Sequence, residues 1–232
     1  MSSQRSTARL AGALYIVTHV TSVAAVVLYG GSAFDPHSAL AGRGSVLLGG
    51  VLEIVLAMAV VGTAVALYPL LRPHSPGFAA GYLGLRTLEA SVILTGVVVL
   101  LPLVARPATT AASALTGDVE VGLRLVHDWT FLVGPGLVVP VHTVLLAWLL
   151  LRAGLVPRFI PVLGLIGGPL VGAMNLAVLA GVTHVVPALV VPVFACRFPC
   201  AGVARMRLRS SSDSPATGRE AWNALPHGAW CA

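Results

Sequence analysis

The chain has 232 residues, of which 57% are hydrophobic and only 9% are charged, and its mean hydropathy is +0.92. Soluble domains carry about 25% charged residues, so this composition excludes an ordinary soluble domain. It predicts an all-α fold, a polytopic integral membrane helix bundle whose main partner is the lipid bilayer. The formal charge is +6, and all 14 basic residues are arginine. Most arginines stand singly at the ends of apolar runs or in the tail, which favours an anionic membrane surface over nucleic acid as the partner.

Five apolar runs are long enough to cross a bilayer, which needs about 20 residues. They cover residues 10–30, 46–71, 78–103, 129–151 and 159–182. A sixth run starts at Val185 and meets Arg197 after 12 residues (185 to 196), about 18 Å of helix against about 30 Å of hydrocarbon. We therefore expect five firm transmembrane helices plus a short or defective sixth.

The segment boundaries follow from these runs. Residues 1–9 are expected to be a cytoplasmic N-terminus, residues 10–196 the transmembrane bundle, and residues 197–232 a disordered basic tail. The first run is longer than the apolar part of a signal peptide, about 7–15 residues, so we interpret it as an uncleaved span. The segments on the side of the N-terminus carry more arginines than the loops on the opposite side. This bias predicts a multi-pass plasma-membrane protein with a cytoplasmic N-terminus.

The longest connection runs from Arg106 to His127. Its second half has Val119, Leu123 and Val126 at helical spacing, so we expect it to lie along the outer surface before the fourth span. A motif at that surface follows: His127, Asp128 and Trp129. Asp128 is expected to cap the helix that enters the membrane at Trp129, because an N-terminal carboxylate favours the helix dipole.

The fifth run carries three glycines at intervals of four residues, Gly164, Gly168 and Gly172. Glycine at this spacing lets helix backbones approach closely, so we expect a helix-packing surface. Cysteine occurs only at Cys196, Cys200 and Cys231, and no histidine lies near Cys196 and Cys200 to complete a zinc set. Neither a metal site nor a cofactor is predicted, and the sequences HExxH, GxSxG and Walker A are absent from the chain.

Five ionisable residues fall inside the apolar runs: His19, Glu53, Arg86, Glu89 and His142. Arg86 and Glu89 are three residues apart, on one face of a helix and within reach of each other. Measured from the ends of the runs at 1.5 Å per residue, Glu53 lies within one helical turn of the depth of Glu89. We therefore expect a single central layer to which several spans contribute.

This layer has two interpretations. In the first, it is a structural pin that fixes the register of the bundle, and the protein is a non-catalytic structural or regulatory subunit. In the second, it is a substrate or proton site, because carboxylates, an arginine and histidines at one depth can exchange protons. The protein would then be a small-molecule or proton-coupled carrier. An intramembrane enzyme acting on lipid is the least favoured alternative. The ligand and any homo-oligomer remain open.

Four stretches together resemble a known family: GTAVALYPLLR, LRTLEASVILTGVV, LVHDWTFLVGPG and GLVPRFIPVLGLIGGPLV. The family consists of bacterial six-helix membrane proteins and is catalogued as domain of unknown function 4386. The resemblance covers residues 9–195 and implies a six-helix architecture without implying an activity. It marks these motif positions: Arg86, Glu89, His127, Asp128, Trp129, Pro157 and Arg158.

The end of the chain departs from the family pattern. Where the family continues an apolar sixth helix, this chain reads CRFPCAGVARMRLRSS. The absence of lysine and the abundance of Ala, Gly, Pro and Arg suggest a GC-rich gene, whose shifted frames encode the same residues. Our hypothesis is that the tail from about Cys196 is a frameshift product, which translation of the alternative frames would test.

Overall fold

The computed structural model describes residues 2–29, 42–105, 117–154 and 156–182. The elements within these ranges are helices: α1 (Ser2–Leu28), α2 (Arg43–Leu71), α3 (Pro76–Ala105), α4 (Gly117–Phe131), the π-helix η2 (Leu132–Val138), α5 (Val139–Ala153) and α6 (Phe159–Leu179). Because α4, η2 and α5 follow one another without a break, they form one long rod. The sixth apolar run, the tail and the three cysteines lie outside the described residues.

Five helical segments of the described chain are long and apolar enough to cross a membrane. They are Ser6–Leu28, Gly44–Leu71, Pro76–Leu101, Val121–Ala153 and Phe159–Leu179. A helix satisfies its backbone hydrogen bonds internally, which is what a chain in hydrocarbon requires. The expected all-α bundle with five spans is therefore confirmed, and the chain is a multi-pass membrane protein. The first helix starts earlier than its apolar run, at Ser2.

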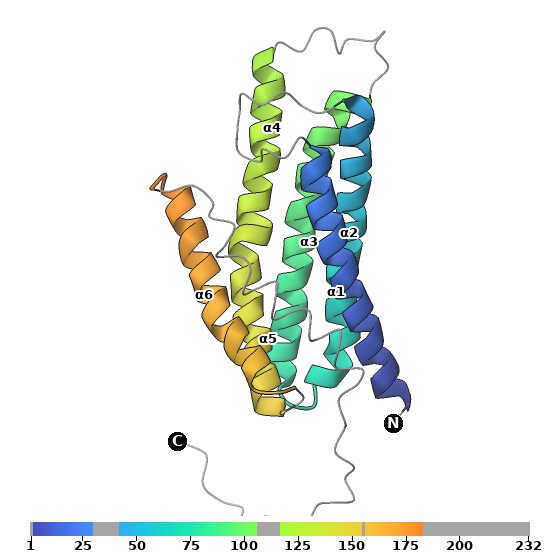
Figure 1. Ribbon diagram of the computed structural model, residues 1–232, viewed down its shortest axis with the longest axis vertical. Coiled ribbons are helices and arrows are strands. Elements are labelled where there is room, and N and C mark those ends of the chain that lie inside the picture. Colours follow the sequence, from blue (N-terminus) through green and yellow to red (C-terminus); the bar gives the residue numbers. More distant parts are fainter. Residues whose placement is uncertain (1, 30–41, 106–116, 155, 183–232) are drawn as a thin grey trace, which may run out of the picture.

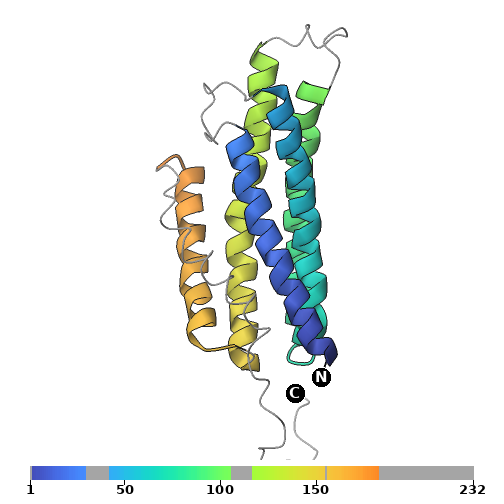
Figure 2. The same cartoon turned by 45° about the vertical axis from the view of Figure 1, so that its right-hand side comes forward.

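The rods run alternately up and down, as Figure 1 shows. We call one end of the bundle the N-terminal end, because α1 begins there; α3 also begins there and α5 ends there. The opposite end is the distal end. Helix α2 packs between α1 and α3, and α3 also contacts α4, η2 and α5. Helix α6 packs on α5 and η2 at one edge of the bundle (Figures 1 and 2).

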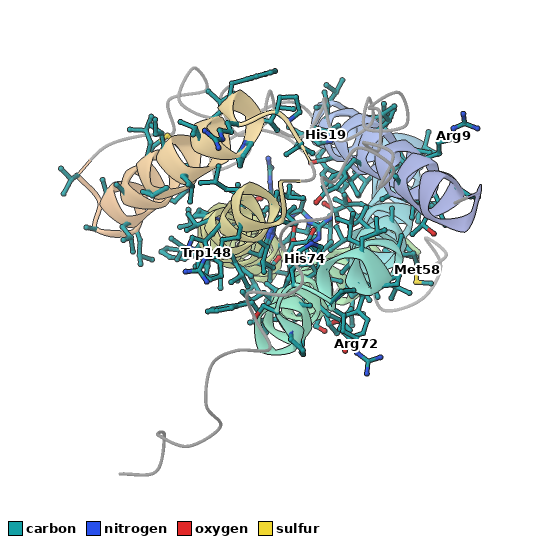
Figure 3. The ribbon with its side chains drawn as sticks, turned by 90° about the horizontal axis from the view of Figure 1, so that it is seen from below. Arg9, His19, Met58, Arg72, His74 and Trp148 are labelled. Atoms are coloured by element: carbon teal, nitrogen blue, oxygen red, sulfur yellow. The ribbon has the colours of Figure 1, made fainter. Side chains whose placement is uncertain are left out.

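The outer faces of the bundle are apolar, as expected of helices surrounded by lipid. Large hydrophobic side chains stay uncovered there, including Met58 and Val98, each 69% exposed. Figure 3 looks along the bundle from the N-terminal end and shows Arg9 and Arg72 projecting away from it. Arg152 also lies at this end, with its guanidinium carbon 4.1 Å from the centre of the Trp148 ring. An arginine stacked on tryptophan is typical of a membrane–water interface.

The fourth span begins earlier than the sequence suggested. Helix α4 starts at Gly117 and continues in line with η2 and α5, rather than lying along the surface (Figure 1). Asp128 is therefore an interior helical residue, and the expectation that it caps a helix starting at Trp129 is wrong. The physical reason is burial: the Asp128 side chain turns into the bundle, where it lies beside His127.

Two prolines account for the π-helix within this span. Pro140 has no N–H, so the carbonyl of Gly136, four residues earlier, lacks its usual α-helical donor. Asn175 of α6 supplies a donor instead, since its Nδ2 atom lies 3.0 Å from the Gly136 oxygen. Pro135 lies inside the π segment itself. The bond from Asn175 fixes α6 to the point where the long rod departs from α-helical geometry.

Helix α6 approaches α5 closely through its glycines. A Cβ atom added to Gly168 would come within 3.1 Å of the Pro140 carbonyl oxygen and 2.8 Å of Val144 Cγ2. A Cβ added to Gly172 would meet the Pro140 ring at 3.3 Å. Gly164, one turn earlier, is buried. The glycine surface expected from the sequence thus lies against α5.

Candidate functional site

The polar side chains buried in the bundle form two separate groups. The inner cluster consists of Thr63 from α2, Arg86 and Glu89 from α3, and His142 from α5. The distal cluster consists of Glu53 from α2, His127 and Asp128 from α4, and Tyr29 at the end of α1. All members except Tyr29 lie within the candidate membrane spans.

Arg86 holds the inner cluster together. Its Nη1 donates to Glu89 Oε2 at 2.9 Å, and its Nη2 donates to Thr63 Oγ1 at 2.6 Å. Thr63 can accept this bond because its own hydroxyl proton is donated to the Val60 carbonyl, 2.7 Å away. His142 Nε2 lies 2.9 Å from the same Glu89 oxygen. Arg86 is 1% exposed, so the charge is sealed from both solvent and lipid.

Two tyrosines enclose this cluster on the side of the N-terminal end. The hydroxyls of Tyr15 in α1 and Tyr82 in α3 are 2.7 Å apart. The Tyr15 ring centre lies 5.5 Å from the guanidinium carbon of Arg86, and the Tyr82 ring packs edge-on against the His142 ring. All four long helices that surround the cluster therefore supply a contact to it, which is what a fixed register requires.

The distal cluster is built around His127. Its Nε2 lies 3.2 Å and 3.3 Å from the two carboxylate oxygens of Glu53, and its Nδ1 lies 3.5 Å from Asp128 Oδ1. Glu53 is fully buried, at 0% exposure. Arg124 precedes Asp128 by one helical turn on α4, a spacing at which opposite charges can interact. The cluster thus places a histidine between two carboxylates inside a membrane protein.

One glycine and two aromatic rings fix the position of the His127 ring. Gly96 of α3 leaves the space, because a Cβ atom there would lie 3.2 Å from His127 Cδ2 and would collide with Thr130 Oγ1. The Tyr29 ring meets the imidazole edge-on at a centroid distance of 5.1 Å, and the Phe131 ring lies 5.5 Å away. The imidazole is therefore held from three sides while it faces Glu53.

The single layer expected from the sequence does not form, because Glu53 is placed with His127 rather than with Arg86 and Glu89. Ten residues separate Glu53 from Thr63 along α2, about 15 Å at 1.5 Å per residue. The sequence estimate failed because α2 has 29 residues, about 43 Å of helix, and α3 has 30. Helices this long overhang the hydrocarbon, so their ends do not mark a common depth.

The remaining residues singled out in the sequence lie elsewhere. His19 is half-buried, with its Nδ1 atom 2.6 Å from the Tyr15 carbonyl oxygen of its own helix. The sequence placed the motif at residues 127–129 on the outer surface, which is wrong for two of its three residues. His127 and Asp128 are buried at 4% and 8% exposure, whereas Trp129 is 48% exposed. Pro157 and Arg158 lie in the turn that precedes α6.

Sequence reasoning missed Thr63, Tyr15, Tyr82 and Tyr29 as members of these groups. A threonine in an apolar helix usually bonds its own backbone, so Thr63 carried no signal of a partner. The tyrosines gave a weak signal, since a buried tyrosine generally needs a partner for its hydroxyl. Within the described residues, no three side chains of His, Cys, Asp or Glu are arranged so that they could hold a metal ion.

The two clusters differ in the charge that opposes their glutamate. Glu89 faces both His142 and Arg86, and the arginine keeps its charge at any physiological pH. Glu53 is paired with a histidine, whose charge depends on a proton. If His127 loses its proton, Glu53 is left as an uncompensated buried carboxylate unless it takes up a proton itself. The distal pair therefore has to hold a proton, whereas the inner pair is neutral without one.

Comparison with known proteins supports the resemblance seen in the sequence. Searches of curated proteins and of solved structures found no match. The model of one family matches residues 10–202, which is most of the chain. The protein therefore belongs to the family described as Domain of unknown function (DUF4386).

Proposed function

We propose that the protein is a small proton-coupled membrane carrier that binds and releases a proton at the Glu53–His127 pair. The observation that supports this most is the charge pairing: among the described residues, the ion-pair partner of the buried Glu53 carboxylate is a titratable imidazole, that of His127, 3.2 Å away. Ionisable groups inside membrane spans are costly and usually serve a pathway for ions or substrates.

The pair is suited to proton transfer in its geometry as well. His127 Nε2 is almost equidistant from the two Glu53 oxygens, at 3.2 Å and 3.3 Å, so either oxygen can share the proton. Asp128 at Nδ1 holds the other side of the ring, and this orients the imidazole towards α2. Two carboxylates on opposite sides of one histidine form a short relay with a site at each end.

The rival function is a structural or regulatory subunit, and one observation favours it for the inner cluster. Arg86 bonds Glu89 and Thr63 at 2.6–2.9 Å and balances the charge of Glu89, although its buried Nε has no hydrogen-bond partner among the described residues. The charges of this pair need no counter-ion from a ligand, and the bonds of Arg86 fix the register of α2 against α3. We therefore assign the structural role to the inner cluster and the exchange role to the distal one.

We further propose a plasma-membrane location with a cytoplasmic N-terminus. Arg9, Arg72, Arg152 and Arg158 gather at the N-terminal end of the bundle, which supports this orientation under the positive-inside rule. A reporter fused after Pro157 should be active in the cytoplasm. An outside signal there would reverse the orientation. The exposed apolar faces fit a lipid bilayer as partner.

Proton flux into liposomes tests the function. The full chain is reconstituted into liposomes with a pH-sensitive dye trapped inside. A potassium gradient and valinomycin then impose an inside-negative membrane potential, which drives protons inwards. The wild type should acidify the lumen faster than empty liposomes, and Glu53→Gln or His127→Gln should abolish the difference. Arg72→Gln, at an exposed position on the same bundle, is the matched control.

The outcomes separate the two functions. If the wild type and Glu53→Gln acidify at the rate of empty liposomes, proton uptake is excluded under this driving force and the structural role is favoured for both clusters. If Glu53→Gln keeps the wild-type flux, the distal pair is not the exchange site even though the protein conducts protons.

A further inference from the structure

Within the part of the chain that the structure describes, the Tyr29 ring covers the distal pair. Tyr29 directly follows α1, and its ring lies edge-on to the His127 imidazole at 5.1 Å. On α2 the ring rests at Gly49, where an added Cβ would come within 2.6 Å of Tyr29 Cε1. Gly49 precedes Glu53 by four residues on the same helical face, about 6 Å closer to the distal end. The ring thus lies between the Glu53–His127 pair and the distal end.

From this geometry we propose that Tyr29 is a lid over the Glu53–His127 pair, and that its movement off Gly49 admits water and protons from the distal end. The role of the lid in proton exchange rests on the proposed function. Whether Tyr29 covers the pair can be tested without measuring proton flux.

The hydrogen bonding of Tyr29 suits a part that moves. Its hydroxyl oxygen is buried, and no close hydrogen bond joins it to a residue that the structure describes, although the Glu53 carboxylate lies near enough to interact with it. A buried hydroxyl without a partner is unfavourable, so outward movement breaks no such bond and lets water solvate the group. Burial and the neighbouring Glu53 carboxylate raise the pKa of the Tyr29 hydroxyl, so it keeps its proton and stays a donor. Packing against Gly49 and the His127 ring, together with the attraction between the hydroxyl and the Glu53 carboxylate, therefore holds the closed position.

Small residues shape the closed position. Gly49 provides the notch on α2 for the Tyr29 ring, and Gly96 provides the notch on α3 for His127. The adjacent Gly50 provides a notch for a different neighbour, since its added Cβ would come within 2.7 Å of Leu101 Cδ2. A methyl group at position 49 therefore displaces the lid, and one at position 50 displaces an apolar side chain of α3. The two alanine variants differ by one position on the same helix.

Carboxyl labelling measures access to Glu53 directly. The purified full chain in detergent is treated with a water-soluble carbodiimide and a glycine ester, and labelling at Glu53 and Glu89 is quantified by peptide mass spectrometry. Tyr29→Ala and Gly49→Ala should raise labelling of Glu53 several-fold over the wild type. Tyr29→Phe, which keeps the ring, and Gly50→Ala should stay near the wild type. Labelling of Glu89 should not change in any variant.

The results decide between clear alternatives. Tyr29 is not a lid if Tyr29→Ala and Gly49→Ala label like the wild type while circular dichroism shows native helix content. The proposal is also overturned if Gly50→Ala raises labelling as much as Gly49→Ala, since general loosening of α2 then explains both. If Tyr29→Ala fails to fold, the comparison of the two glycine variants decides. A wild type without proton flux but with the expected labelling pattern refutes the function and leaves the lid standing.

Discussion

Replacement of Arg86 by methionine tests whether the inner cluster is a charge-balanced pin. Methionine has nearly the length of the arginine stem, so the change removes the charge while it leaves little cavity. Arg86 is 1% exposed and Glu89 is 4% exposed, so the substitution leaves a carboxylate buried without its cation. The Thr63 hydroxyl loses the arginine as donor but keeps its own bond to the Val60 carbonyl.

The magnitude follows from this change in pairing. Breaking a buried ion pair by removal of one partner costs about 3–5 kcal/mol. At about 2–4 °C per kcal/mol for a chain of this size, Arg86→Met should lower the Tm by about 6–20 °C. Adding Glu89→Gln removes the stranded charge and keeps an oxygen for His142. The double variant should then lose only about 1–2 kcal/mol for the missing hydrogen bonds.

Thermal unfolding in detergent, followed by circular dichroism, compares the wild type with the two variants and with Arg72→Met. Arg72 is exposed at the N-terminal end, so its replacement should leave the Tm unchanged. The reasoning is refuted if Arg86→Met melts with the wild type, or if the double variant melts below the single one. Either result would mean that Glu89 does not depend on Arg86 for its charge balance.

Three further measurements probe the same packing. Glu53→Gln and Arg86→Met should act additively on stability, within about 0.5 kcal/mol, because sites more than 7–10 Å apart without shared partners do not couple. A coupling above about 1 kcal/mol in the double-mutant cycle would instead support the single layer expected from the sequence. Asn175→Ala should cost about 1 kcal/mol through loss of its bond to the π-helix, read as a lower Tm. Gly168→Ala should lower the Tm more than Gly172→Ala, because its new methyl meets a backbone oxygen at 3.1 Å rather than a side chain at 3.3 Å; equal losses would show that α6 can shift along α5.

The fold was predictable because lipid imposes a simple rule on composition. A run of about 20 apolar residues has to be helical to satisfy its backbone, so the number and order of the spans follow from the sequence. The helix ends were less predictable. The segment at residues 117–128 has helical spacing but is too polar to be identified as part of a span, yet it continues in line with the fourth span, whose His127 and Thr130 pack at Gly96 of α3.

The inner ion pair was also predictable, since Arg86 and Glu89 are three residues apart on one helix. Its partners on other helices were not. Whether Glu53 meets Arg86 or His127 depends on how α2 is shifted along its axis relative to α3 and α4. A shift of a few residues exchanges one partner for the other, and apolar helices carry little in their sequence that fixes this shift.

The small residues of the interfaces supply what the apolar pattern lacks. Gly49 and Gly96 each admit one ring, Tyr29 and His127, that no larger residue would allow at the same place. The position of these rings brings His127 to Glu53 and covers the pair from the distal end. The glycines of α2 and α3 thus help to place His127 opposite Glu53, the pair for which we propose proton exchange.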